Sequence, residues 1–339
     1  MIDYNFSDIL SSIAAVSSQR KYWMVRTMAG VYYADFIRHN YIAIGYNEIS
    51  LQQLNNLPQS NKQAKEALKS LFADVYPENR NSGHSIGQLL RFARELQVGD
   101  VVIIPSESAM HVAIGIITSG MYEEEELSIN VDNRCQFKKR MRVEWKSVSR
   151  RKYLSPSLQI MFVSRHTISD VSSYAPYIDS KISDCYLKNE EMNLVLRIST
   201  RKDVSVDDFF NLKALITLVD NFCEENNFDF TGEAITMKIQ MESPGWLRLS
   251  CKSASKLLLF GLFLIAINGG GISYNSDDGL DIRMTGIMES ISNYKDREAD
   301  RMLLNAAIQS LDSLKIQNPN DLQPIIELMK VRNDIREKY

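Results

Sequence analysis

The sequence predicts an α+β protein built from two domains, and three observations support this fold class. The chain has 339 residues, whereas a typical domain contains about 100–200 residues. Its hydrophobic fraction of 45% and charged fraction of 24% are ordinary globular values. They exclude a wholly disordered chain, a fibrous repeat and a disulfide scaffold. Strand-like runs and helix-like patterns both occur in each half of the chain.

The first half carries the pattern of a small curved or barrel-like sheet with two helices. A short helical pattern over residues 8–18 comes first. Helical spacing then predicts helices over residues 61–73 and 86–96, and Ser85 is placed to cap the second. Runs rich in aromatic and β-branched residues predict strands at residues 22–26, 41–46, 101–105, 112–117 and 141–145. The third and fourth of these strands form a predicted hairpin at the centre of the sheet.

The second half predicts a further α+β domain around a buried apolar helix. Residues 166–190 are rich in Ser, Asp and Tyr and predict a linker between domains at 1–165 and 191–339. The expected elements, in chain order, are a strand at 194–198, a helix opening at Ser205, a hairpin around Ser243-Pro244-Gly245, the apolar helix at 257–267 and a final helical section from about Arg297, broken near Pro319.

The sequence predicts neither stable membrane insertion nor a metal or cofactor site. The apolar run 257–267 has eleven residues, fewer than the ~20 that cross a bilayer. The four cysteines form no C-x-x-C pair, which argues against structural zinc. Because these cysteines are scattered and the chain does not start like a secretory signal, we expect a cytoplasmic protein.

A basic stretch over residues 134–152 predicts contact with nucleic acid. The net charge of −3 excludes an overall basic, nucleic-acid-coating protein, but not a local basic surface. The stretch holds nine basic residues against one acid, Glu144: Arg134, Lys138, Lys139, Arg140, Arg142, Lys146, Arg150, Arg151 and Lys152. The alternative is an edge strand on which lysines block pairing with other molecules.

The first half also resembles a known family. Its Tyr22-Trp23-Met24-Val25-Arg26 and Ile42-Ala43-Ile44-Gly45-Tyr46 segments, the helix at 86–96, the run 99–105 and the closing Arg142-Val143-Glu144-Trp145 follow one another as in PUA/EVE-like domains. The resemblance is to the variety found ahead of Mrr-like restriction endonucleases and other bacterial defence effectors, and it covers about residues 20–165. One departure is Tyr46, where such domains more often carry Trp.

This resemblance implies a domain with an aromatic pocket. The pocket would hold a flipped, possibly modified base of DNA or RNA, or it would hold a nucleotide-like ligand. Trp23 and Tyr46 would stack on the base, and stacking contributes about 1–3 kcal/mol. Arg26 would hydrogen-bond a base edge or a phosphate. Gly45 would allow the ligand to approach the backbone closely, and Pro105 would complete the rim of the pocket. The alternative is that Trp23 and Tyr46 are ordinary core residues.

The leading prediction is therefore a nucleic-acid or nucleotide recognition protein in a bacterial defence or restriction context, and a binding protein rather than an enzyme. The second half would be an effector or a homo-oligomerisation module. One alternative is a metal-dependent enzyme that uses Asp207, Asp208 and the acidic cluster at 277–281. Another is a structural protein that binds a partner through the helix at 257–267.

Overall fold

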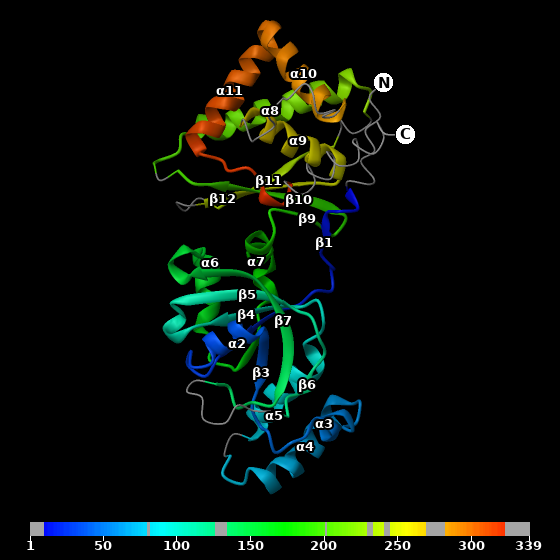
Figure 1. Cartoon of the computed structure of the whole chain (residues 1–339), viewed down its shortest axis with the longest axis vertical. Coiled ribbons are helices and arrows are strands. Elements are labelled where there is room, and N and C mark those ends of the chain that lie inside the picture. The colour runs from blue at the N-terminus through cyan, green and yellow to red at the C-terminus, as the bar shows by residue number, and fades with distance from the viewer. Residues whose placement is uncertain are drawn as a thin grey trace. The chain divides into compact units, whose positions relative to one another are not determined.

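The computed structural model describes residues 10–79, 82–125, 134–200, 202–228, 233–240, 245–268 and 282–322, and the chain divides into two compact units. Residues 19–182 form the N-terminal unit, and residues 1–18 together with 183–339 form the C-terminal unit. Each unit combines helices with a sheet, which confirms the predicted α+β class (Figure 1).

The N-terminal unit is built on a curled sheet with the strand order β3-β7-β5-β4-β2-β8, and β6 pairs with β7. Its strands are β2 (Tyr22–Val25), β3 (Tyr41–Ile44), β4 (Val101–Pro105), β5 (His111–Ile117), β6 (Tyr122–Glu123), β7 (Lys139–Arg150) and β8 (Ile168–Asp170). The predicted hairpin is confirmed, because β4 and β5 pair antiparallel in the middle of this order. The long strand β7 pairs with β3 through residues 139–142 and with β5 through residues 143–150, so it links two parts of the sheet.

Side chains of this sheet alternate between two cores. Trp23 and Val25 of β2 belong to the first core, whereas Tyr22 and Met24 belong to the second, as expected for successive residues of a strand. The helices that contribute to the first core are α2 (Tyr33–His39), α3 (Leu51–Asn55), α4 (Asn61–Val75), α5 (Ser82–Leu90) and the π-helix η1 (Arg91–Glu95). The second core takes residues from α6 (Pro156–Ile160) and α7 (Ala175–Ile182).

The two predicted helices are present as α4 and as α5 with its η1 extension, and shorter helices accompany them. These short helices span five to eight residues, too few to show a helical period in the sequence. Ser85, the predicted cap, lies inside α5, because this helix begins at Ser82. The Ser85 hydroxyl instead accepts a hydrogen bond from the Asn79 side chain at 3.0 Å.

The N-terminal unit extends past the boundary that composition predicted. Strand β8 pairs antiparallel with β2, and Ile178 of α7 is buried in the second core. The predicted linker at 166–190 is therefore folded, and its last residues form β9 (Cys185–Lys188) of the C-terminal unit. Its polar residues close turns rather than span a gap: the Asp170 carboxylate accepts a hydrogen bond from the Ser172 backbone at 2.8 Å.

The C-terminal unit has a sheet of order β1-β9-β10-β12-β11 with helices on one side (Figure 1). Its further elements are β1 (Ala14–Ala15), β10 (Glu191–Ile198), α8 (Val206–Glu225), β11 (Thr236–Gln240), β12 (Gly245–Cys251), α9 (Ala254–Ile267), α10 (Ile282–Asp296) and α11 (Glu298–Leu314). The predicted hairpin is present as β11 and β12. Of the leading helix expected over residues 8–18, Leu10 alone is helical among the described residues, and the following β1 pairs parallel with β9.

Helix α9 is the buried apolar helix that the sequence predicts. Each residue from Lys256 to Ile265 is buried, and the Lys256 ammonium lies 2.7 Å from the Asp220 carboxylate and 2.7 Å from the Glu233 carbonyl oxygen. Within the described ranges, no helix combines the length and the apolar character that crossing a membrane requires. The last described α-helix, α11, ends at Leu314, ahead of the break predicted near Pro319, and the 3-10 helix η6 (Asn320–Leu322) follows that proline.

Candidate ligand-binding site

Trp23, the first residue predicted to stack on a base, is a core residue. Its side chain is 1% exposed and packs in the first core. The indole Nε1 donates to the Asp100 carboxylate at 2.8 Å, so its polar atom is also satisfied inside the protein. The prediction of a stacking platform is therefore wrong at Trp23. Both faces of β2 are buried, one in each core, so no residue of this strand is left to line an open pocket.

Gly45 and Tyr46 also lie among packed side chains. The Tyr46 ring packs against Phe72 and Tyr76, with centroid distances of 5.2 and 5.8 Å. A Cβ atom at Gly45 would lie 3.1 Å from the Phe137 ring, so that ring fills the space in which a ligand was expected. Neither residue lies at an open pocket with Arg26, and the predicted constellation is not assembled.

The basic stretch is divided by the alternation of β7. Lys139 points inward and is fully buried, where its ammonium donates to the Tyr46 carbonyl oxygen at 2.9 Å and lies 3.9 Å from Glu123. Burial lowers the pKa of Lys139. The prediction that Lys139 contacts phosphate is wrong, because a strand presents alternate side chains to opposite faces. Arg142, Lys146, Arg150 and Lys152 are exposed, whereas Lys138 and Arg151 are half-buried.

Three arginines of the stretch line a cavity of about 250 Å³, here named the Arg134 cavity: Arg134, Arg140 and Arg142, together with His39, Tyr41, Tyr122, Glu124 and Cys135. Arg134 donates to the buried Asp35 carboxylate at 3.0 Å. Arg140 donates to Glu124 at 3.2 Å and lies over the Tyr41 ring at 4.2 Å. Two of the three guanidinium groups therefore already have carboxylate partners.

A second cavity, here named the Arg26 cavity, has a volume of about 420 Å³ and lies between the loops that follow β2 and β4. It brings together three residues that the sequence singled out from distant segments, namely Arg26, Pro105 and Arg151. Thr27, Ala29, Gly30, Ser106, Glu107, Ser108, Ala109 and Phe162 complete its lining. Glu107 is the only acidic residue among the described residues that line it.

Protein carbonyl groups hold both arginines of the Arg26 cavity in place. The Nη2 atom of Arg26 donates to the Phe162 carbonyl oxygen at 2.7 Å and to that of Ser164. The Arg151 guanidinium donates to the Gln159 carbonyl oxygen at 3.3 Å and lies 5.5 Å from the Phe162 ring centroid. In the described part of the chain, neither arginine pairs with a carboxylate, and Nε and Nη1 of Arg26 have no acceptor. Partial burial lowers the pKa of Arg26.

The two loops of the Arg26 cavity have an unusual backbone. Met28, Ala29, Ser108 and Ala109 have φ between 50° and 53°, and Gly30 has φ of 101°. A left-handed conformation costs a non-glycine residue roughly 1–2 kcal/mol, and such residues concentrate at ligand sites. A Cβ atom at Gly30 would overlap the Glu107 backbone, and the Thr27 hydroxyl donates to the Pro105 carbonyl oxygen at 2.6 Å. Tight contact between the loops therefore holds this conformation.

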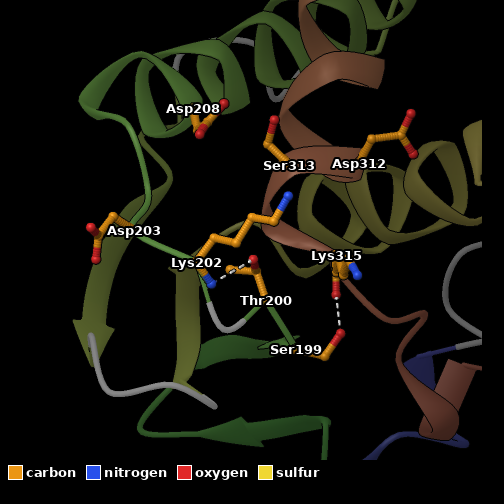
Figure 2. Close-up of a pocket in the computed structure, with 8 residues that line it drawn as sticks. All are labelled: Ser199, Thr200, Lys202, Asp203, Asp208, Asp312, Ser313 and Lys315. Carbon is orange, nitrogen blue, oxygen red and sulfur yellow. Dashed lines mark hydrogen bonds between the residues drawn. The ribbon is translucent and has the colours of Figure 1, made fainter.

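The C-terminal unit contains a cavity of about 490 Å³, here named the Lys202 cavity (Figure 2). Asp208, an acid of the predicted enzyme alternative, lies there, but its carboxylate accepts a hydrogen bond from the Ser205 backbone at 3.1 Å as part of the α8 cap. Asp203 and Asp312 lie on other sides of the space and point apart (Figure 2). Among the described residues, no group of three His, Cys, Asp or Glu side chains is placed to hold a metal ion. The predicted cluster at 277–281 lies outside the described residues.

The four cysteines are free thiols, and all are buried. Burial raises the pKa of Cys185 and Cys223 to about 12 and that of Cys135 to about 11, and it also raises the pKa of Cys251. A thiol with a raised pKa is a poor nucleophile. Burial therefore disfavours the reactive thiolate form of all four cysteines.

Residues 23–170 match the model of one family, described as Domain of unknown function (DUF8426). This match lies within the N-terminal unit and covers nearly the same residues as the PUA/EVE-like resemblance. The comparisons with curated proteins and with solved structures return no match. The Arg26 cavity lies inside the matched segment, and the Lys202 cavity lies outside it.

Proposed function

We propose that the N-terminal unit binds nucleic acid, or a nucleotide-like ligand, through the Arg26 cavity. The observation that carries this proposal is the presence of two arginines, Arg26 and Arg151, in one cavity without a carboxylate partner among the described residues. An arginine that is not neutralised by the protein is available for a phosphate or a base edge. Phe162 adds an aromatic wall, and the volume is in the usual range for ligand sites.

The exposed end of β7 supports the same proposal. Arg150 and Lys152 flank the half-buried Arg151 and are exposed. These cations lie next to a cavity residue in the sequence, so they suit a ligand that extends beyond the cavity. An oligonucleotide extends in this way, whereas a single nucleotide does not. Contacts of this kind to phosphates position the ligand, whereas base-edge contacts inside the cavity would select it.

The nature of the base is also part of the proposal. Trp23 and Tyr46 pack in the core, so any preference for a modified base would come from the shape of the Arg26 cavity and from Phe162. We place the protein in the cytoplasm, where its four free thiols would stay reduced. The bacterial defence context implied by the PUA/EVE-like resemblance is consistent with a sensor of this kind.

The C-terminal unit is proposed to mediate self-association. Helices α8 and α11 run antiparallel, since Asn221 donates to Asp300 at 3.1 Å while Ser310 donates to the Asp208 carbonyl oxygen. Phe210 on α8 and Met302 on α11 are 69% and 68% exposed. Sedimentation at increasing concentration would show a mass above that of the monomer, and Phe210→Asp would abolish the increase. A wild type that stays monomeric at all concentrations would exclude this role.

Fluorescence anisotropy with labelled single-stranded DNA and RNA, each with and without base modifications, tests the main proposal. We expect wild-type protein to bind, and Arg151→Gln to weaken binding about 10-fold or more, because it removes a charged hydrogen-bond donor. Arg301→Gln is the charge-matched control, since Arg301 is exposed on α11 in the C-terminal unit. Equal affinity of Arg151→Gln and wild type would contradict the proposal. Mg²⁺-dependent loss of the intact oligonucleotide would favour the enzyme alternative.

A further inference from the structure

A third cavity, here named the His84 cavity, has a volume of about 280 Å³ and lies in the N-terminal unit. The sequence patterns gave no reason to connect the residues around it, which come from α4, α5, η1 and the loop before β8. Among the described residues, its charged and titratable lining consists of Lys65, His84, Arg91, Arg94, Glu95 and His166. Glu95 is the only acid among them, and its carboxylate lies 3.4 Å from the Arg91 guanidinium.

Gln88 directs a hydrogen-bond donor into this cavity. Its side chain is 6% exposed, and its Oε1 accepts a hydrogen bond from the Ile168 backbone at 2.6 Å. Because the oxygen is fixed in this way, Nε2 is the atom left to face the cavity, and it has no acceptor among the described residues. A ligand in the cavity that accepts a hydrogen bond can therefore use this amide donor.

The remaining lining suits an anion. The His84 and His166 rings stack with centroids 5.1 Å apart, and both side chains are exposed. Arg94 donates to the Leu57 and Pro58 carbonyl oxygens at 3.1 and 2.9 Å, so it holds the wall of the cavity in place. The adjacent π-helix η1 carries Arg91, Arg94 and Glu95, and π-helical turns are frequent at functional sites.

The His84 and Arg26 cavities lie at the two ends of one short segment. Phe162 lines the Arg26 cavity and His166 lines the His84 cavity. Four residues of chain reach at most ~14 Å, and one nucleic-acid strand carries a phosphate about every 3.4 Å of helix axis. The spacing between these two lining residues is therefore no more than about four phosphates of one strand.

We propose that the His84 cavity binds a phosphate group of the nucleic-acid strand that occupies the Arg26 cavity, with Gln88 Nε2, Lys65 and the two histidines as donors. This proposal rests on the function proposed above. It makes the ligand an oligonucleotide rather than a single nucleotide, because the second phosphate must lie beyond the nucleotide in the Arg26 cavity.

Gln88→Glu is the sharpest variant for testing the His84 cavity. The carboxylate keeps an acceptor for the Ile168 N–H and replaces only the donor, so it repels a phosphate. We expect oligonucleotide affinity to fall about 10-fold or more, while the affinity for a nucleoside monophosphate stays at the wild-type value. His84→Ala combined with His166→Ala removes two exposed side chains and serves as the second variant if Gln88→Glu unfolds. Lys62→Ala is the control, since Lys62 is exposed on α4 but does not line the cavity.

Anisotropy titrations with a short single-stranded oligonucleotide and with the nucleoside monophosphate separate the outcomes. Selective loss of oligonucleotide affinity in either folded variant supports the phosphate site. If wild type binds the oligonucleotide and both variants bind it equally well, the His84 site is overturned and the Arg26 site stands. If wild type binds no oligonucleotide, both proposals are overturned.

Discussion

The Arg26 cavity and the Arg134 cavity both contain arginines, but the groups around the guanidiniums differ. In the Arg134 cavity, Arg134 pairs with Asp35 at 3.0 Å and Arg140 pairs with Glu124 at 3.2 Å. In the Arg26 cavity, the arginines are held by carbonyl oxygens of Phe162, Ser164 and Gln159. A carbonyl group positions an arginine and leaves its charge available, whereas a carboxylate neutralises it. The density of basic residues along a sequence therefore does not by itself define an anion site.

The largest expected effect comes from breaking the loops of the Arg26 cavity. Gly30→Ala would place a Cβ atom against the Glu107 backbone at φ of 101°. We expect a loss of about 2–5 kcal/mol of unfolding free energy, from the left-handed conformation and the overlap together. Denaturant unfolding followed by fluorescence measures this loss. Gly120→Ala is the control, because no atom lies within 4 Å of its added Cβ; equal stability of the two variants would contradict the account.

Removing an arginine from the Arg134 cavity should affect stability rather than binding. Arg134→Ala leaves the buried Asp35 carboxylate with the Tyr41 hydroxyl at 2.5 Å, the Cys135 N–H at 2.9 Å and the His39 Nδ1 at 3.0 Å as partners. We expect a loss of about 1–3 kcal/mol, with oligonucleotide affinity unchanged in the folded protein. Thermal unfolding measures the loss of stability, and anisotropy on the same sample measures the oligonucleotide affinity. A variant with wild-type stability that no longer binds the oligonucleotide would assign binding to the Arg134 cavity and contradict this prediction.

The pH dependence of stability sharpens the same contrast. Burial favours a raised pKa for Asp35, but hydrogen bonds from Tyr41, Cys135 and Arg134 together lower the pKa below its ordinary value of 3.8. A lowered folded-state pKa contributes stability that is present above pH 3.8 and is lost as the pH falls through the folded-state value. Asp35→Asn should therefore flatten the acid limb of a stability curve measured below pH 5. An unchanged limb would show that Asp35 is not part of the charge network.

Most elements predicted from local patterns are present, except the leading helix over residues 8–18 and the linker at 166–190, whereas the contacts between distant segments could not be predicted. Apolar runs and turns located the β4–β5 hairpin and α9. The resemblance selected Arg26 and Pro105, which do line one cavity. Nothing in the sequence indicates that Asp35 meets Arg134, because 99 residues separate them. Strand alternation could not predict the position of Trp23, because both faces of β2 are buried, one in each core.

The same reasoning explains why the His84 cavity was missed. His84 and His166 are single residues in unremarkable surroundings, and 82 positions of the sequence separate them. Only the packing of β8 beside β2 brings the preceding loop to α5. A histidine in each of two segments carries no signal until the fold joins the segments.

The salt dependence of oligonucleotide affinity tests the central claim most directly. For wild type and a single-stranded oligonucleotide, two to four phosphate contacts predict a log–log slope of about −1.4 to −2.8. The account predicts that Arg151→Gln shifts this slope toward zero by about 1, and that Arg134→Gln leaves it at the wild-type value. A slope that changes with Arg134→Gln and not with Arg151→Gln would contradict the account and assign phosphate binding to the Arg134 cavity.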